Sequence, residues 1–515
     1  MRRPATIKRY HWAVAIVGLA SCIVPLSGCG EDQVNSVSSA AVPTPSRGGG
    51  VAIPALEGPV SGGAGKPFLA STTVDLAQVG YSEAEYFISG SATSYENVGG
   101  LGTDGKWTIT PGSQADYKTR IVVYRPTEPA KFNGTVIVEW LNVSGGVDAA
   151  ADWLTGHTQL IRDGCAWVGV SAQYVGVEGG PSLLGLIVAP LKKTDPERYG
   201  SLVHPGDSFS YDIFSQTAQA IRRPSGTNPL AGLPIRAVIG AGDSQSAFRL
   251  VTYINAVQPV ADIYDGFLVH SRGGSGISVA ALSEAPQKAI GVPGTALIRT
   301  DLDAPVLIFE TETDLTFLGY AKARQPDGEA VRVWEVAGTA HADTYTTGVG
   351  STDLGTSPDA ANLVLTTTAA PGVSCDVPIN SGPQHFVFNA ALAALNRWVR
   401  QGTPPPAAPR LTVAAGSPVT LVRDGHGNAL GGIRTPQVDV PIATLAGELP
   451  GLSVCSLFGQ TVPFDSATLA SLYPTHAAYV SEFGAATDQA VQAGFLLQPD
   501  AALMKAAAAA SNIGQ

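Results

Sequence analysis

Short apolar runs of strand length alternate with segments of helical spacing along most of this chain. The runs of strand length are Thr135–Leu141, Trp167–Ala172, Ile235–Ile239, Val306–Phe309 and Val331–Val336. The segments of helical spacing include Asp152–Arg162, Tyr211–Arg223 and Ala247–Val257. Continuous apolar runs are typical of strands buried on both faces, and strands that alternate with helices favour a parallel sheet. We therefore predict an α/β fold with a mostly parallel sheet and helices on both faces.

The string GAGDSQSA, residues 240–247, lies between a predicted strand and a predicted amphipathic helix. Small residues two places before and two places after a serine allow a sharp strand-to-helix turn that exposes the serine as a nucleophile. Gly242 fills the first place, and Ser246 stands at the second, where glycine is usual. This context predicts Ser244 as a nucleophile. The alternative is an ordinary glycine-rich turn with a serine helix cap.

A serine nucleophile needs a base and an acid that orients the base, and in this arrangement they follow in the order serine, acid, histidine. His341 follows the strand predicted at Val331–Val336. It therefore lies at the carboxyl end of a parallel strand, where open α/β sheets place their sites. We predict His341 as the base, with His270, at the end of another short apolar run, as its rival.

The orienting acid is expected just after the strand predicted at Val306–Phe309, where the string Glu310 to Asp314 contains three carboxylates. Glu310 directly continues the strand and is expected to lie too deep. Asp314 is the predicted acid, and Glu312, with its longer side chain, is the alternative.

These strings together resemble the α/β-hydrolase fold, and more narrowly a family of bacterial exported α/β-hydrolase-domain proteins of poorly defined substrate. The resemblance covers about residues 75–500. It is carried by EWLNVSGG (139–146), HPGDSFSYDIFSQ (204–216), GAGDSQSA (240–247), TETDL (311–315), VAGTAHAD (336–343), GNALGGIRTPQVDVP (427–441) and CSLFG (455–459). The resemblance implies esterase-type chemistry, and it implies that the segment after residue 405 belongs to the hydrolase unit.

Two backbone donors are expected to stabilise the negative charge that develops on the substrate's carbonyl oxygen. One is the N–H of Gln245, the residue after the nucleophile. The other is expected in the loop after Thr135–Leu141, from the N–H of Asn142 or of Val143. This chemistry needs no cofactor, and no cluster of Cys and His has the spacing of a metal site.

The N-terminus is typical of an exported protein. A basic start and an apolar stretch end in Leu26-Ser27-Gly28-Cys29, which resembles the lipobox of bacterial lipoproteins. We expect a signal peptide at 1–28, lipidation of Cys29 by palmitate or a similar acyl chain, and a flexible tether at 29–66. The body is divided into a catalytic domain at 67–405, with a lid-like insertion at Ser271–Thr300, and a C-terminal extension at 406–515 packed on it.

Cysteine usage fits an oxidising compartment. Cys375 and Cys455 lie in loops and are expected to form a disulfide, while Cys165 is expected as a buried thiol. Anchoring through Cys29 would place the protein at a bacterial membrane, on its periplasmic side or at the cell surface.

The predicted function is a serine hydrolase that cleaves a carboxylic ester, with a small-molecule or lipid-like ester as substrate. An amidase or peptidase with the same triad is one alternative, and a non-catalytic binding lipoprotein is another. The 42 acidic residues outnumber the 31 basic ones, for a net charge of −11. Nucleic acid is therefore not expected as a partner, because binding phosphates needs clustered Lys and Arg.

Overall fold

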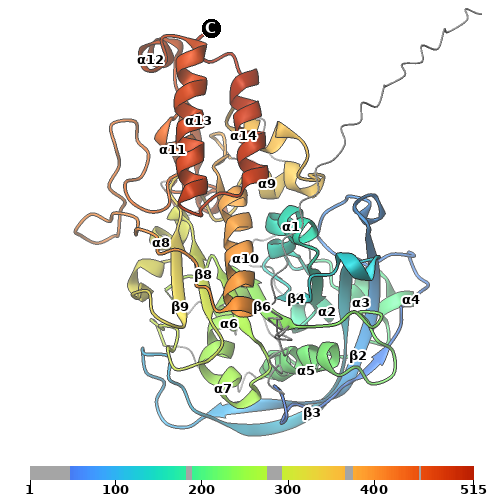
Figure 1. Ribbon diagram of the computed structural model, residues 1–515. Coiled ribbons are helices and arrows are strands. Elements are labelled where there is room, and N and C mark those ends of the chain that lie inside the picture. Colours follow the sequence, from blue (N-terminus) through green and yellow to red (C-terminus); the bar gives the residue numbers. More distant parts are fainter. Residues whose placement is uncertain are drawn as a thin grey trace, which may run out of the picture. The chain divides into compact units, whose positions relative to one another are not determined.

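A sheet of nine strands forms the centre of the protein, seen here in a computed structural model that describes residues 47–180, 182, 188–274, 293–365, 375–449, 451 and 454–515 (Figure 1). The strands of this sheet are β1 Ala55–Glu57, β2 Tyr81–Asn97, β3 Ile109–Pro126, β4 Thr135–Trp140, β5 Ala166–Val170, β6 Ala237–Asp243, β7 Gly266–His270, β8 Val306–Glu310 and β9 Val331–Glu335. Their order across the sheet is β1-β2-β3-β5-β4-β6-β7-β8-β9. The six strands from β5 to β9 are parallel, and β1, β2 and β3 add an antiparallel edge. The predicted α/β fold with a mostly parallel sheet is confirmed.

Helices cover both faces of this sheet. The helices are α1 Ala151–Asp163, α2 Tyr174–Val177, α3 Leu191–Thr194, α4 Pro196–Tyr199, α5 Ser210–Arg222, α6 Gln245–Thr252, α7 Gln258–Ala261, α8 Glu312–Thr316, α9 Thr344–Thr347, α10 Gln384–Gln401, α11 Pro436–Asp439, α12 Ser466–Leu472, α13 His476–Gln492 and α14 Gln498–Ala510. Alternate residues of a strand point to opposite faces. Val136 and Val138 of β4 therefore join the core under α5 and α6, while Ile137 joins the core under α1 and α10.

A buried carboxylate near the carboxyl end of β4 fixes the start of α1. Glu139 accepts hydrogen bonds from the backbone N–H groups of Asp152 and Trp153, both at 2.9 Å, and from the indole of Trp167 at 2.8 Å. The first N–H groups of a helix have no partner within the helix, so a carboxylate there satisfies them and complements the helix dipole. Burial is the main cause that raises the pKa of Glu139. The polar residue in this otherwise apolar strand thus positions a helix.

The described part of the predicted tether differs from the expectation of a free linker. β1 pairs with β2 and forms the edge of the sheet, and Arg47 forms ion pairs with Asp262 and Asp265. Backbone hydrogen bonds need no apolar periodicity, so the pattern used to predict strands does not detect this one. The described residues, which begin at 47, belong to one compact unit. The predicted signal peptide, Cys29 and the first part of the tether lie outside the described residues.

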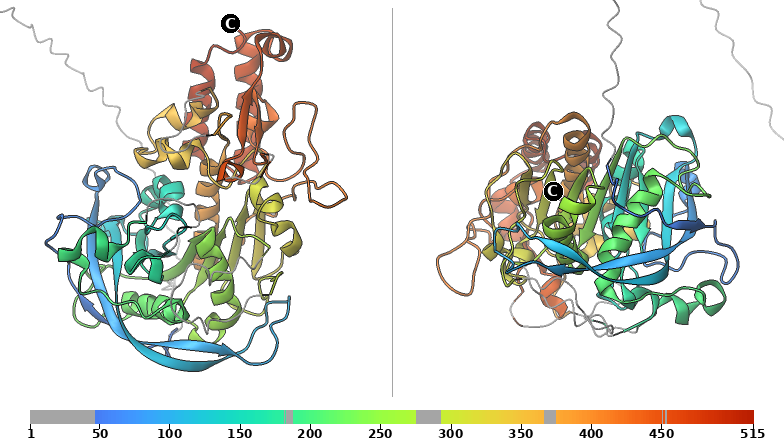
Figure 2. Two further views of the ribbon diagram at one scale, coloured as in Figure 1. Left: turned by 180° about the vertical axis from the view of Figure 1, so that it is seen from behind. Right: turned by 90° about the horizontal axis from the view of Figure 1, so that it is seen from below.

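The C-terminal extension packs on the same body, where α13 and α14 stand side by side above the sheet (Figures 1 and 2). It attaches beside β9, since Ile433 donates its N–H to Glu335 O and accepts from Ala337 N–H. It also contributes a two-stranded sheet, β10 Ala443–Ala446 and β11 Gln460–Pro463.

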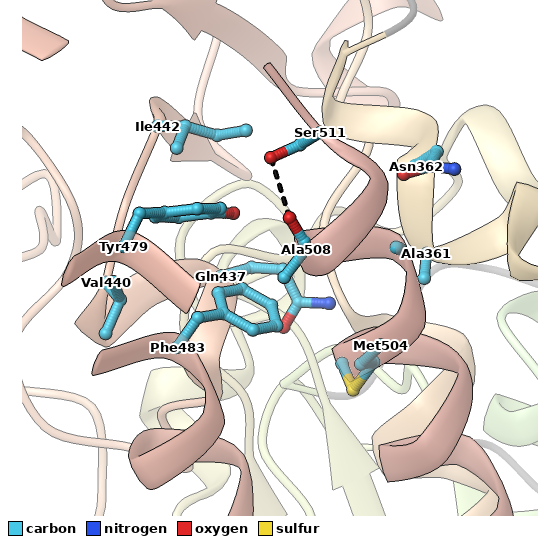
Figure 3. A pocket seen from close by; sticks show the side chains of 11 residues that line it. Ala361, Asn362, Gln437, Val440, Ile442, Tyr479, Phe483, Met504, Ala508 and Ser511 are labelled. Atoms are coloured by element: carbon cyan, nitrogen blue, oxygen red, sulfur yellow. Dashed lines mark hydrogen bonds between the residues drawn. The ribbon is translucent and has the colours of Figure 1, made fainter. Parts of the chain in front are cut away.

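A small cavity lies among the C-terminal helices, lined by Tyr479, Phe483 and Met504 among others (Figure 3). Its open space of about 20 Å³ is room for a single water molecule and too small for an organic substrate. In the described ranges, the helices lack the combination of length and apolar character that a membrane-crossing segment needs.

Candidate active site

Ser244 occupies a strained turn between β6 and α6. Its backbone has φ 55° and ψ −120°, outside the regions that residues with a side chain normally adopt. Gly242 permits this turn, because a Cβ there would lie 3.2 Å from the backbone of Ser246. Ser246 replaces the usual glycine without blocking the turn, since its hydroxyl bonds back to the N–H and the carbonyl of Asp243. Strain of this kind costs about 1–3 kcal/mol and clusters at functional sites.

A chain of two short hydrogen bonds links Ser244 to His341 and Asp314. Ser244 Oγ lies 2.8 Å from His341 Nε2, and His341 Nδ1 lies 2.7 Å from Asp314 Oδ1. Asp314 is fully buried, and its other oxygen accepts from the N–H and the hydroxyl of Thr311, both at 2.7 Å. The carboxylate therefore faces His341 in a fixed orientation. This geometry lets the imidazole take a proton from the serine hydroxyl.

The charge state of His341 is set by two opposing effects. Burial lowers its pKa, but the carboxylates of Asp314 and Asp243 outweigh burial, so the pKa lies above its ordinary value. The two carboxylates thus favour the imidazolium that forms when His341 takes the proton of the serine hydroxyl.

Glu312, the alternative acid of the sequence prediction, points elsewhere. Its carboxylate accepts from Gly338 N–H at 2.6 Å, from Gly447 N–H at 3.0 Å and from the Arg423 guanidinium at 3.1 Å. These contacts tie the loop before His341 to the C-terminal extension. Glu312 thus holds the framework of the site, and the partner of His341 Nδ1 is Asp314.

His270, the rival base, lies one strand away from the nucleophile. Its Nδ1 is 2.9 Å from Asp152 Oδ1 and 3.3 Å from Asp243 Oδ1, and its Nε2 faces the amide of Gln384 at 3.2 Å. Its backbone carbonyl accepts the N–H of Ser244 at 3.0 Å. His270 therefore supports the turn through its backbone, while the partner of Ser244 Oγ is His341.

The cluster around His270 was not found from the sequence. Burial raises the pKa of Asp152 to about 8. Burial likewise raises the pKa of Asp243 to about 6, although His270 and His341 oppose this shift. The position of Asp243 directly before Ser244 was the available signal, since the side chain of that residue must lie beside the turn.

The backbone N–H groups expected to stabilise the oxyanion differ in whether they already have a hydrogen-bond partner. The N–H of Gln245 is the first of helix α6 and has no partner within the helix. The N–H of Asn142 is committed to Ala149 O at 2.9 Å, which corrects the Asn142 alternative. The amide side chain of Asn142 instead donates to Asp243 O at 3.0 Å and braces the turn. The N–H of Val143 makes no hydrogen bond to any described residue, so it stays available as the second donor.

A disulfide lies close to the loop that carries His341. Cys375 and Cys455 are bonded, with their Cα atoms 5.8 Å apart. Two residues after Cys455, Leu457 O accepts the N–H of Ala342, the residue after His341. The disulfide therefore links two parts of the chain that are distant in sequence, beside the base.

Cys165 is a buried thiol, and burial raises its pKa to about 12.

Two other sequence predictions concern a lid and a metal. The lid-like insertion at Ser271–Thr300 falls largely on residues 275–292, outside the described residues. Within the ranges that the structure describes, no group of three or more His, Cys, Asp or Glu is arranged to hold a metal ion.

Comparison with known proteins gives one extensive match. A family model for the alpha/beta hydrolase domain matches residues 56–506, which include most of the C-terminal extension. No curated protein matches the sequence. Similar solved structures include an α/β serine hydrolase without a lid from Xanthomonas campestris, at 10% identity and a TM-score of 0.25, covering 47% of this chain and 83% of that one. The glucuronoyl esterase from Solibacter usitatus is 11% identical with a TM-score of 0.26, and the match covers 50% of this chain and 76% of that one. A thermostable esterase from Pseudomonas putida is 12% identical with a TM-score of 0.24, covering 51% and 75%.

Proposed function

Because this chain belongs to the alpha/beta hydrolase domain family, we propose that it is a serine hydrolase that cleaves a carboxylic ester. The observation that carries the proposal is the contact chain Ser244–His341–Asp314 at 2.8 and 2.7 Å on a strained strand-to-helix turn. A nucleophile, a base in contact with it and an acid that orients the base are the three groups that acyl transfer needs.

In the proposed mechanism, Ser244 Oγ attacks the carbonyl carbon while His341 Nε2 takes the hydroxyl proton. Asp314 holds the other nitrogen of the imidazole as a donor and stabilises the imidazolium that forms. The N–H groups of Gln245 and Val143 stabilise the negative oxygen of the tetrahedral intermediate. His341 then gives the proton to the leaving alcohol. Water, activated by the same histidine, releases the acid from Ser244.

Labelling with a fluorophosphonate and hydrolysis of a 4-nitrophenyl ester test this proposal together. Wild-type protein is expected to be labelled and to release 4-nitrophenol, and Ser244→Ala is expected to lose both. Ser82→Ala is the control for loss of a serine hydroxyl, because Ser82 lies on β2, outside the triad, and its hydroxyl has no hydrogen-bond partner among the described residues. Labelling of a folded Ser244→Ala protein at the wild-type level would rule out Ser244 as the nucleophile. A matched 4-nitroanilide substrate separates an esterase from an amidase.

We also propose that the protein is exported and anchored by a lipid on Cys29. The string Leu26-Ser27-Gly28-Cys29 after an apolar stretch supports this, and so does the disulfide, since disulfides persist in oxidising compartments. Cys29→Ser is expected to move the protein from the membrane to the soluble fraction and to abolish labelling by a palmitate analogue. Unchanged fractionation and labelling would refute the anchor.

A further inference from the structure

A group of buried polar side chains that starts at Gln245, the residue after the nucleophile, has hydrogen-bonding atoms without a partner. The side chains are those of Gln173, Ser208, Gln245 and Arg249, of which none is more than 4% exposed. The atoms without a partner are Gln173 Nε2, Ser208 Oγ, both amide atoms of Gln245 and Arg249 Nε. Buried polar atoms are nearly always hydrogen-bonded, and leaving one unpaired costs free energy. Five such atoms in one region therefore need partners from outside the chain, either ordered water or a ligand that displaces it.

Contacts between neighbouring elements bring these four side chains together. Gln173 follows β5 and Gln245 follows β6, and these strands flank β4 on its two sides. Asp207 links the group, because it accepts from Tyr174 N–H at 2.7 Å and from Arg249 Nη2 at 2.9 Å. Gln173 directly precedes Tyr174, and Ser208 directly follows Asp207.

Gln245 connects this group to the site of reaction. It lies four residues before Arg249 on helix α6, so the two side chains are neighbours on one face. It also directly follows Ser244. The group therefore begins at the nucleophile and extends from it towards Gln173 and Ser208.

The chemistry of the group selects the kind of ligand it would hold. Most of the free atoms are donors: two amide nitrogens, one guanidinium nitrogen and a hydroxyl. The one cation, Arg249, is paired with Asp207, so the group carries no net charge. Free donors without net charge suit hydroxyl and carbonyl oxygens better than a carboxylate or a hydrocarbon chain.

We propose that Gln173, Ser208, Gln245 and Arg249 form a substrate subsite that binds an uncharged group rich in oxygen, such as a hydroxylated acyl chain or a polyol alcohol. This proposal rests on the proposed esterase function. Preferred substrates then carry hydroxyl groups near the ester bond, and a plain hydrocarbon ester leaves the donors of the subsite unpaired.

Two pairs of matched esters test the subsite. 4-Nitrophenyl 3-hydroxybutyrate and 4-nitrophenyl butyrate differ on the acyl side, and glyceryl monobutyrate and propyl butyrate differ on the alcohol side. In at least one pair, kcat/KM is expected to be about tenfold or more higher for the hydroxylated ester, because a site built to pair with a hydroxyl discriminates against the analogue that lacks it.

Variants of the subsite test whether its side chains cause the preference for the hydroxylated ester. Ser208→Ala removes a hydroxyl that has no partner, so no hydrogen bond of the structure is lost. Gln173→Glu keeps an oxygen for the indole of Trp140 and replaces the free donor by an acceptor. Both variants are expected to reduce the preference for the hydroxylated ester to about twofold or less, whereas the distant Ser82→Ala should leave it unchanged. A preference fully retained in both subsite variants would place its origin elsewhere.

Binding to a folded Ser244→Ala protein separates this proposal from the proposed function. Calorimetry of the same ester pairs is expected to show tighter binding of the hydroxylated member. Equal dissociation constants and equal kcat/KM values in both pairs would overturn the subsite while leaving the hydrolase intact. Absence of all hydrolysis by the wild-type protein would overturn the proposed function, and the binding comparison would still decide on the subsite.

Discussion

Replacing Asp314 by Asn tests the arrangement of the site at its most sensitive point. One oxygen of Asp314 accepts two hydrogen bonds from Thr311, both at 2.7 Å, and the other faces His341 Nδ1. In the amide, the single remaining oxygen is expected to keep the two donors of Thr311. The amide nitrogen then faces His341 Nδ1 and donates to it. The imidazole must carry its proton on Nε2, where it can no longer accept one from Ser244.

The expected loss of turnover in Asp314→Asn follows from this change of tautomer in His341. A triad whose histidine holds the wrong tautomer loses turnover by about 10⁴-fold. At 1.36 kcal/mol for each factor of ten, the barrier rises by about 5.5 kcal/mol. The fold should be little affected, because the size of the side chain and the contacts with Thr311 are retained. Initial rates on a 4-nitrophenyl ester measure turnover, and circular dichroism and thermal unfolding of the same samples measure whether the fold is retained.

Glu312→Gln is the matched comparison, because it makes the same chemical change two residues earlier. Its carboxylate accepts from Gly338, Gly447 and Arg423, so the amide loses an acceptor and a charge partner within the framework. We expect a loss of about 1–3 kcal/mol in the free energy of unfolding and only a small change in turnover of the folded enzyme. Turnover within tenfold of wild type in a folded Asp314→Asn enzyme would refute the assignment of Asp314. A loss near 10⁴ in a folded Glu312→Gln enzyme would refute the structural role of Glu312.

Three further predictions follow from the same region. Replacing both Cys375 and Cys455 by Ser opens a loop with a sequence separation of 80, so the free energy of unfolding in urea should fall by up to about 4.5 kcal/mol; a change below about 1 kcal/mol would contradict this. Because the pKa of His341 lies above its ordinary value, kcat/KM should fall as the pH is lowered through that pKa, and Asp243→Asn should move the midpoint to lower pH; an unmoved midpoint would exclude this influence of Asp243. Gly447→Ala should lower the temperature of thermal unfolding, because its Cβ would clash with the backbone oxygen of Thr339 in the loop before His341; an unchanged unfolding temperature would contradict this.

Short contiguous strings of the sequence predict much of the site. The turn at Ser244 needs a buried strand, a glycine two places earlier and a helix directly after, and all three occur within residues 235–257. Parallel strands end at a common edge of the sheet, so the placement of His341 and of the acidic string at that edge also follows from local patterns. These features depend on the backbone preferences of individual residues and on the pattern of apolar residues, and both can be read from the sequence.

The tertiary structure decided which of several nearby groups is used. Asp314 and Glu312 are two residues apart, and the difference between them depends on contacts with Gly447 and Arg423, more than a hundred residues later in the chain. The sequence allows Asn142 as an oxyanion donor, but its N–H bonds the carbonyl of Ala149. The edge strand β1 forms through backbone pairing with β2 and leaves no apolar pattern. Residue order thus determined the kind of groups at each strand end, whereas their partners depend on the packing of elements far apart in the chain, which local periodicity does not encode.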